Sequence, residues 1–308
     1  MHTNPTKEAG LMSKLTGLTV LAAAIGLITL AARADSAVTT KIVYHSKLRG
    51  NNEILVVPAA GGAPTRLTRH RASDSNPTWS TDGRRIAFES NRRGHIRARD
   101  ADVYVMTSDG TRIRQLTFSN AFDGDPAWSW LNRIAFESDR SGSTDVWAID
   151  ADGTDEKQLT KTTAFDGDPA WSPDGSKIVF TSERDNGDRE IYVMNVDGSG
   201  QTRLTATPGF DENPSWSPDG KRIAFDSMRD GNLEIYVMNA DGSKQVRVTD
   251  HPALDALPAW SQDSKRIVFV SDRIGKPQRR LFVMNAGGSN VRMLTRGATD
   301  MSPDWAQG

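Results

Sequence analysis

Residues 165–205 read FDGDPAWSPDGSKIVFTSERDNGDREIYVMNVDGSGQTRLT, and most of the chain repeats this stretch. The same order of residues returns, once with an insertion, at Phe122–Thr160, Phe210–Thr249, Leu254–Thr295 and Asp74–Thr117. Self-similarity with a period of roughly 40–50 residues is typical of propellers and other repeat proteins. The repeat is therefore the unit of the fold.

One repeat predicts four short β-strands. Tight turns are expected at Pro173-Asp174-Gly175 and at Asn195–Gly198, because Pro presets φ and Gly permits positive φ. The segments between the turns are rich in β-branched and aromatic residues, as strands are. The predicted strands are Ala170–Ser172, Lys177–Thr181, Glu190–Met194 and Thr202–Thr205.

Four-stranded antiparallel units repeated around an axis predict an all-β fold, a six-bladed β-propeller. The first unit lacks its first strand, and Ser302–Trp305 repeats that strand at the other end of the chain. We expect the C-terminal strand to pair with the N-terminal strands and close the ring, which leaves no open sheet edge. The expected blades are Trp305 with 41–68, then 79–117, 128–160, 171–205, 216–249 and 260–295.

The N-terminal residues differ from the repeats. Lys7 and Lys14 precede an apolar run, Leu15–Ala32, that ends in Ala32-Arg33-Ala34. This layout predicts a secretory signal peptide over residues 1–34, a short linker over 35–40 and the propeller over 41–308. The alternative is an uncleaved membrane anchor, since the run is long enough to span a bilayer. In both cases we expect the repeats outside the cytoplasm, periplasmic or secreted.

Composition limits the kinds of partner and site that the chain can have. The formal net charge is −1, which favours no nucleic-acid partner, and the absence of Cys excludes disulfides and thiolate metal sites. A membrane contact is expected only through the N-terminal segment if it is not cleaved. We expect a monomer.

The repeated Trp residues predict packing between adjacent blades. A buried Trp contributes ~2–3 kcal/mol through its apolar area. We assign no catalytic role to these residues, which are Trp79, Trp128, Trp171, Trp216, Trp260 and Trp305.

Two polar residues also recur. An Asp stands three residues before the Pro of each first strand, and an Arg follows the second strand in five blades. Both sets are expected at one mouth of the central channel, because the two connections that carry them emerge on the same face. We interpret them as structural pairs that lock blade to blade; the alternative is a carboxylate ring for a ligand or a cation such as Ca²⁺. The residues are Asp74, Asp123, Asp166, Asp211, Asp255 and Asp300, with Arg92, Arg140, Arg184, Arg229 and Arg273, and Arg49 near the first blade.

Function is expected where the repeat symmetry breaks. Blade 2 carries a basic insertion at Asn91–Asp100, and blade 6 a basic loop at Arg273–Arg280. These loops could form a patch for an acidic partner or could simply be solvated. The candidate binding residues are Arg92, Arg93, His95, Arg97, Arg99, Lys276, Arg279 and Arg280. No catalytic residue and no metal ligand is assigned.

The pattern Asp-x-x-Pro-x-Trp-Ser-Pro-Asp-Gly, clearest at Asp166–Phe180 and Asp211–Phe225, resembles the WD40-like (PD40) repeats of the TolB-like family. The resemblance covers residues 41–305. It implies a six-bladed propeller in a periplasm. TolB-like proteins join such a propeller to an N-terminal α/β domain, and we expect that domain to be missing here, which puts a role in the Tol-Pal system in doubt.

The functional prediction is an exported, non-enzymatic binding or scaffold propeller that holds a protein or a peptidoglycan-associated partner. The alternative is a carbohydrate-active lyase or hydrolase with its site in the channel mouth, since similar propellers include pectin-fragment lyases. We expect no cofactor beyond a channel cation.

Overall fold

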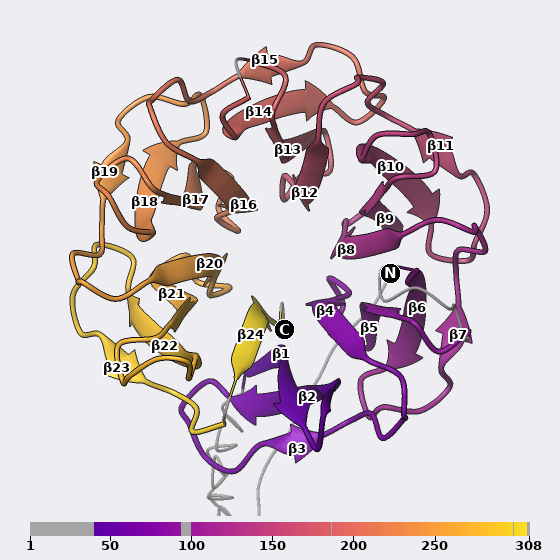
Figure 1. Ribbon diagram of the computed structural model, residues 1–308, viewed down its shortest axis with the longest axis horizontal. Helices are drawn as coiled ribbons and strands as arrows, with labels where there is room; N and C mark the ends of the chain where they lie inside the picture. The colour runs from indigo at the N-terminus through magenta and orange to yellow at the C-terminus, as the bar shows by residue number, and fades with distance from the viewer. Residues whose placement is uncertain (1–39, 94–99, 186, 298, 307–308) are drawn as a thin grey trace, which may run out of the picture. The chain divides into compact units, whose positions relative to one another are not determined.

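The computed structural model describes residues 40–93, 100–185, 187–297 and 299–306. In these residues the chain forms β-strands joined by turns and loops, and each of the six sheets has four antiparallel strands. None of the described segments is a helix that could cross a membrane. The expected all-β, six-bladed propeller is confirmed, with the blades arranged around a central channel (Figure 1).

The strands of each blade follow one another from the channel outward. In blades 1 to 3 they are β24 (Asp300–Trp305), β1 (Lys41–Leu48), β2 (Asn51–Pro58) and β3 (Thr65–Arg66); β4 (Asp74–Trp79), β5 (Arg85–Ser90), β6 (Asp102–Thr107) and β7 (Arg114–Gln115); β8 (Asp123–Trp128), β9 (Arg133–Ser138), β10 (Asp145–Asp150) and β11 (Lys157–Gln158).

Blades 4 to 6 repeat this order. Their strands are β12 (Asp166–Trp171), β13 (Lys177–Ser182), β14 (Glu190–Asn195) and β15 (Thr202–Arg203); β16 (Asp211–Trp216), β17 (Arg222–Ser227), β18 (Glu234–Asn239) and β19 (Val246–Arg247); β20 (Asp255–Trp260), β21 (Arg266–Ser271), β22 (Arg280–Asn285) and β23 (Arg292–Met293).

The ring closes as the sequence predicts. The C-terminal strand β24 pairs antiparallel with β1, placing Trp305 opposite Ile42 and Asp300 opposite Ser46. Figure 1 shows the yellow β24 completing the indigo first blade. Both ends of the described chain therefore share one sheet, and the ring has no unpaired seam.

In blade 4 the two middle strands run one residue further than expected, and the first and outer strands differ more. The first strand of blade 4 begins at Asp166 rather than Ala170, because Asp166 and Gly167 already pair with Ser182 and Thr181 across a β-bulge. The outer strand pairs over Thr202 and Arg203 alone. Its next residue, Leu204, instead turns inward against the following blade, whose residues surround it in one hydrophobic cluster.

The hydrophobic core lies between the blades, as expected. In one interface Trp128 and Phe136 of blade 3 pack with Ala87, Val103 and Val105 of blade 2. The Nε1 of Trp171 donates to the Ala127 carbonyl oxygen of the preceding blade at 3.1 Å. Each first-strand Trp therefore joins two sheets.

We call the face that carries the loops after the second strands the loop face. The face that carries the hairpin turns after the first and third strands is the turn face. The two names follow from the up-down order of the strands within each sheet.

Candidate binding site at the channel mouth

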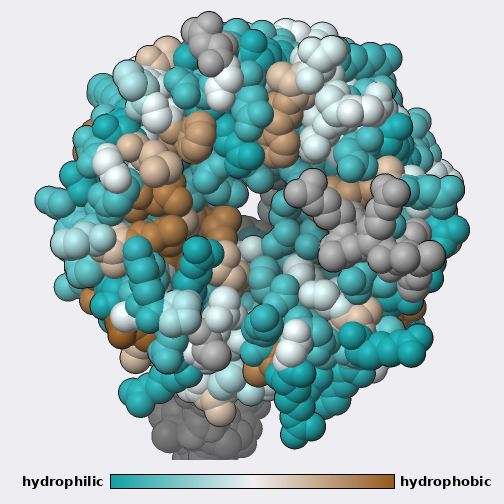
Figure 2. Space-filling model, viewed as in Figure 1, coloured by the Kyte–Doolittle hydropathy of each residue, from teal (hydrophilic) through white to brown (hydrophobic). Residues whose placement is uncertain are grey.

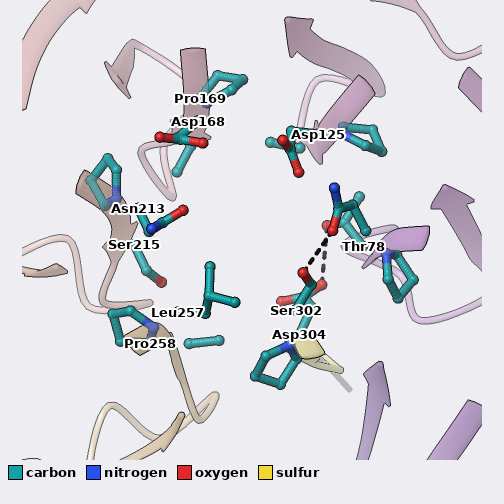
Figure 3. Close-up of a pocket in the computed structure, with 18 residues that line it drawn as sticks. Thr78, Asp125, Asp168, Pro169, Asn213, Ser215, Leu257, Pro258, Ser302 and Asp304 are labelled. Carbon is teal, nitrogen blue, oxygen red and sulfur yellow. Dashed lines mark hydrogen bonds between the residues drawn. The ribbon is translucent and has the colours of Figure 1, made fainter. Parts of the chain in front are cut away.

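The central channel is lined by the first strand of every blade. Figure 3 shows its residues converging from all six blades around a cavity of about 180 Å³. Each blade contributes one side chain two residues after its repeated Asp. These six side chains are Asn76, Asp125, Asp168, Asn213, Leu257 and Ser302.

The same six residues share a left-handed backbone. Their φ values lie between 43° for Asp125 and 56° for Leu257. Each stands in or next to a bulge of the first strand, where the register with the second strand shifts. Asn and Asp adopt this conformation readily, whereas a branched residue such as Leu257 rarely does. The bulge turns each of these side chains toward the channel axis.

A polar side chain of the preceding blade holds several of these bulges in place. The backbone NH of Asp125 donates to Glu89 Oε2 and that of Asp168 to Glu137 Oε2, both at 3.3 Å. The NH of Leu257 donates to Asp226 Oδ2 at 2.9 Å. The acceptors occupy the same position of their second strands, so this position joins neighbouring blades beside the channel.

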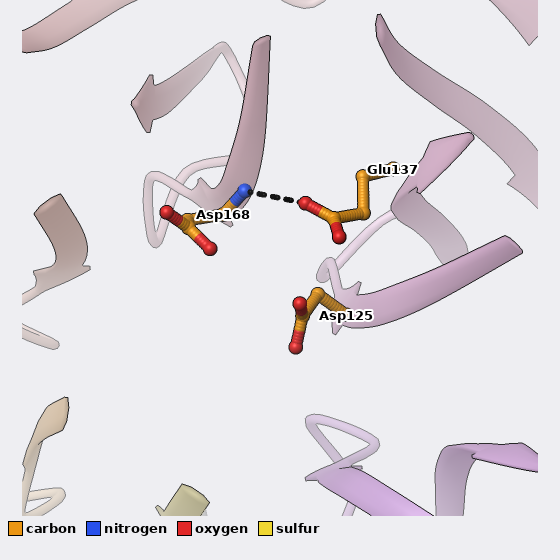
Figure 4. A group of neighbouring side chains, drawn as sticks. All are labelled: Asp125, Glu137 and Asp168. Atoms are coloured by element: carbon orange, nitrogen blue, oxygen red, sulfur yellow. Dashed lines mark hydrogen bonds between the residues drawn. The ribbon is translucent and has the colours of Figure 1, made fainter. Parts of the chain in front are cut away.

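Carboxylates gather on the blade 3 and blade 4 side of the channel. Oxygens of Asp125, Glu137 and Asp168 lie within 4.8 Å of one another (Figure 4). Burial, and second the charge of Glu89, raises the pKa of Asp125 to about 7. Burial, and second the charge of Asp125, raises the pKa of Asp168 to about 7. The pKa of Glu137 is also raised well above its usual range, chiefly by burial.

The pKa values in this group, which we call the acidic cluster (Asp125, Glu137 and Asp168), are raised because its members are buried and, second, because they and neighbouring carboxylates repel one another. Carboxylate oxygens are the ligands that Ca²⁺ and Mg²⁺ prefer. The cluster thus has the chemistry to hold a divalent cation or a cationic side chain.

The opposite side of the mouth is apolar. Leu257 lines the channel there, and Phe210, Met228 and Ile274 are each about 40% exposed on neighbouring loops. Figure 2, a view of the loop face, shows hydrophobic residues gathered over blades 5 and 6 beside the channel opening. We call Phe210, Met228, Leu257 and Ile274 the apolar patch. The channel mouth therefore has one acidic and one apolar side.

The repeated Asp and Arg residues lie away from the channel lining. Asp74 is fully buried and forms an ion pair of 2.8 Å with Arg92, whose guanidinium also stacks over Phe88 and Tyr104. The pairs lie within one blade, not between blades, because both residues flank the first two strands of the same sheet. The equivalent pairs are Asp123–Arg140, Asp166–Arg184, Asp211–Arg229 and Asp255–Arg273.

Blade 1 departs from this pairing. Asp300 is fully buried and accepts a hydrogen bond from the backbone NH of Gly297 at 3.1 Å. Arg49, the expected partner, lies in the turn between β1 and β2 with a φ of 55°. Main-chain pairing of β24 with β1 joins the first two strands of this blade, as the equivalent pairing does in the others.

The described residues of the two basic loops make separate contacts and do not contact one another. Arg93 donates to the Ser119 carbonyl at 3.4 Å in blade 2, whereas Lys276 in blade 6 is 81% exposed and 3.9 Å from Asp272. Arg279 contacts Met301, and Arg280 donates to Gln278. Arg92 belongs to the buried pair described above. His95, Arg97 and Arg99 lie outside the described residues.

Sequence reasoning missed the acidic cluster and the apolar patch. A signal for the cluster is present, because the residue before each first-strand Pro reads Asn, Asp, Asp, Asn, Leu and Ser around the ring while the Asp two residues earlier is constant. The variable position faces the channel. The constant Asp two residues earlier is the more conspicuous feature of the repeat.

Comparison with known proteins places the chain in a family. Four overlapping stretches, residues 28–130, 124–207, 155–244 and 204–308, match PD40, the TolB beta propeller domain. The chain belongs to the TolB beta-propeller family. The resemblance drawn from the repeats is confirmed.

Curated relatives match a part of the chain. The Tol-Pal system protein TolB of Francisella tularensis subsp. mediasiatica (strain FSC147) is 28% identical over 101 residues. That match covers 33% of this chain and 22% of the relative, so the shared segment is less than a quarter of the relative's length.

Solved structures share the fold. TolB from Acinetobacter baumannii has a TM-score of 0.75 at 20% identity, covering 87% of this chain and 66% of that one. A putative TolB from Agrobacterium tumefaciens has a TM-score of 0.67 at 24% identity, covering 85% and 88%. An oligogalacturonate lyase from Vibrio parahaemolyticus has a TM-score of 0.58 at 16% identity, covering 83% and 74%. At these identities the likeness concerns the fold alone.

Proposed function

We propose that this chain is a non-enzymatic binding propeller of the cell envelope, which holds a protein partner on its loop face. The observation that carries the proposal is the two-sided channel mouth, with the apolar patch on blades 5 and 6 facing the acidic cluster on blades 3 and 4. Membership of the TolB family supports a protein-interaction scaffold.

The apolar patch and the acidic cluster suit different parts of one partner. Exposed Phe, Met and Ile side chains beside a channel favour an apolar anchor, since interface energy is concentrated in a few buried apolar contacts. Partly neutralised carboxylates on the opposite side of the mouth favour a cationic group that enters the channel. The partner we propose therefore presents an apolar residue and a basic residue close together.

The cell envelope is proposed from the relatives. The curated relatives are Tol-Pal system proteins, and the N-terminal pattern of the sequence predicts export. We propose a periplasmic location and an envelope partner, with peptidoglycan-associated proteins among the candidates. A divalent cation at the acidic cluster is the alternative to a cationic group of the partner, because both would bind the same carboxylates.

The experiment is affinity capture from envelope extract with three forms of the protein. Ile274→Asp places a charge in the apolar patch, and Lys265→Asp places a charge on the exposed turn face as a matched control. We expect the same partner to be retained by the wild type and by Lys265→Asp, and to be reduced at least tenfold with Ile274→Asp. Equal retention by all three forms contradicts binding at this mouth.

The lyase alternative is less well supported. The oligogalacturonate lyase from Vibrio parahaemolyticus shares the fold of this chain at 16% identity. Fold likeness at that level does not imply shared chemistry. Incubation with oligogalacturonides, followed by absorbance of the unsaturated product, checks it directly. Turnover that Glu137→Gln abolishes would replace the binding proposal.

A further inference from the structure

Trp216 departs from the pattern of the repeated tryptophans, all six of which lie within the described residues. Five of them are 1–7% exposed, whereas Trp216 is partly buried at the edge of its cluster. It belongs to the first strand of blade 5, β16, and faces blade 4. Trp216 is therefore the least covered of the six, although Trp79 and Trp171 are buried without a stacked arginine.

At three other interfaces the cover is an arginine of the preceding blade. In each case it is the first residue of the second strand, and its guanidinium carbon lies 4.5–5.0 Å from the centre of the Trp ring. Such stacking is attractive because the ring face is electron-rich. The pairs are Arg85 on Trp128, Arg222 on Trp260 and Arg266 on Trp305.

Two of these arginines also donate a hydrogen bond to the turn of the next blade, one to a backbone and one to a side-chain oxygen. Arg222 Nη2 donates to the Ser264 carbonyl oxygen at 2.7 Å, and Arg85 Nη2 donates to Asn132 Oδ1 at 2.7 Å. Ser264 and Asn132 occupy the same position of the first hairpin turn in the next blade. A guanidinium in this place thus meets a ring face and a hydrogen-bond acceptor at once.

Blade 4 has Lys177 where these blades have arginine. Its Nζ donates to Asn195 Oδ1 of its own blade at 3.2 Å, and no cation of the described residues stacks on Trp216. The turn residue equivalent to Ser264 is Gly220, and a side chain there would meet nothing within 4 Å. A cavity of about 740 Å³ opens beside Trp216, Lys177 and Gly220.

The walls of this cavity suit an arginine side chain. Pro173, Val193 and Leu204 supply apolar surface for an aliphatic stem. Hydrogen bonds from Ser172 and Ser176 hold the pKa of Asp174 below its usual range, and those from Ser243 do the same for Asp241. Both carboxylates line the cavity and are charged at neutral pH.

We propose that this crevice between blades 4 and 5, which we call the Trp216 crevice, binds an arginine side chain of a partner polypeptide. The guanidinium stacks on Trp216 and donates to the Gly220 carbonyl, as Arg222 does on Trp260 and Ser264. The chain itself thus supplies the template for the contact.

A polypeptide fits the surroundings better than a small cation. The cavity is much larger than one guanidinium and continues into a second cavity of about 120 Å³ that shares Trp216, Pro173 and Pro218. Trp130 lines this second cavity, and Trp130 and its neighbour Leu131 are 60% and 58% exposed in the turn of blade 3. These side chains offer contacts to residues that flank the arginine. The crevice lies on the turn face, so the proposal does not rest on the loop-face function.

Isothermal titration with the pentapeptide acetyl-Gly-Leu-Arg-Leu-Gly-amide tests the proposal. We expect the wild type to bind it at least tenfold more tightly than the same peptide with citrulline, which keeps the shape and removes the charge. Lys177→Arg should weaken binding at least tenfold, since the new guanidinium covers Trp216. Melting curves establish that the variant is folded.

The matched control is a variant that we expect to gain a second binding site. Arg222→Lys removes the guanidinium that stacks on Trp260, so we expect the stoichiometry to rise from one peptide toward two. No binding by the wild type at millimolar peptide, equal binding of the citrulline peptide, or undiminished binding by Lys177→Arg each overturns the proposal.

Two further results would identify a different occupant and also overturn it. Wild-type dimers that Lys177→Arg dissociates in sedimentation would assign the crevice to a second copy of the chain. Binding of acetyl-arginine amide as tight as that of the pentapeptide would assign it to a small cation.

Discussion

At the residue scale, position within the repeat decides what a side chain does. The Asp that is constant in all six first strands is buried, and in five blades it is paired with an Arg, whereas the residue two places later varies and faces the channel. The constant residue stabilises every blade, and the variable one gives the mouth its two sides.

The two kinds of Trp make this difference measurable. Trp171→Ala removes a ring that is 7% exposed and donates to Ala127, so we expect a loss of ~3–5 kcal/mol in unfolding free energy. Trp130→Ala removes a ring that is 60% exposed and should cost less than about 0.5 kcal/mol. Urea denaturation compares the two; equal losses would contradict the placement of Trp171 between blades.

The acidic cluster predicts how stability depends on pH. The pKa values of Asp125 and Asp168 are raised to about 7 in the folded protein, so these groups bind protons there that the unfolded chain has released. Their contribution to stability is fully present below the unfolded pKa of about 4 and is lost as the pH rises through about 7. We expect the cluster to lower the melting temperature between pH 5 and pH 8.

Asp125→Asn should therefore raise the melting temperature at pH 8 by roughly 2–4 °C and flatten its pH dependence. Asp155→Asn, at an exposed surface position, serves as the control and should leave the slope unchanged. A melting temperature that falls in Asp125→Asn at pH 8 would show that the carboxylate is stabilised in the fold.

The change in melting temperature on adding calcium is a second test of the acidic cluster. A cation that binds the three carboxylates should raise the melting temperature of the wild type at pH 8, because it binds the folded form alone. Glu137→Gln removes one ligand and should reduce that rise, while Asp155→Asn should retain it. An equal calcium response in all three proteins assigns the effect to other sites.

At the element scale, the strand β24 has a role that its length does not suggest. Its six residues supply the first strand of blade 1 and place Trp305, 1% exposed, between blades 6 and 1. Deletion of residues 300–308 exposes the edge of β1 and removes that ring. We expect a fall of more than 10 °C in melting temperature, whereas deletion of 307–308 alone should change it little. An unchanged curve for the longer deletion contradicts closure through β24.

Strand order and closure could be predicted because they depend on a pattern repeated along the chain. The Pro-x-Trp at 303–305 completes a unit that begins at residue 41, and pairing between the two follows from the missing strand. The bulge after Asp166 could not be predicted from alternation alone. It depends on a backbone NH that donates to a side chain of the preceding sheet, as Asp168 donates to Glu137.

At the scale of the whole molecule, a few departures from the repeat make the sides of a ring of similar blades differ from one another. Asp125 and Asp168 make one side of the mouth acidic, Leu257 and Ile274 make the other apolar, and Trp216 lies beside an open cavity on the turn face. The sequence predicted that function would lie where symmetry breaks. It pointed to the basic loops, because charge runs are visible in a sequence and the convergence of six strands on one axis is not.

The central claim, a partner held at the two-sided channel mouth, is tested most directly by photo-crosslinking in cells that make the protein at its native level. A photoreactive amino acid is placed at Ile274 in the apolar patch and, separately, at Lys265 on the turn face. We predict one adduct of defined mass from position 274 that is absent from position 265. No adduct at 274, or the same adduct from both positions, contradicts the claim.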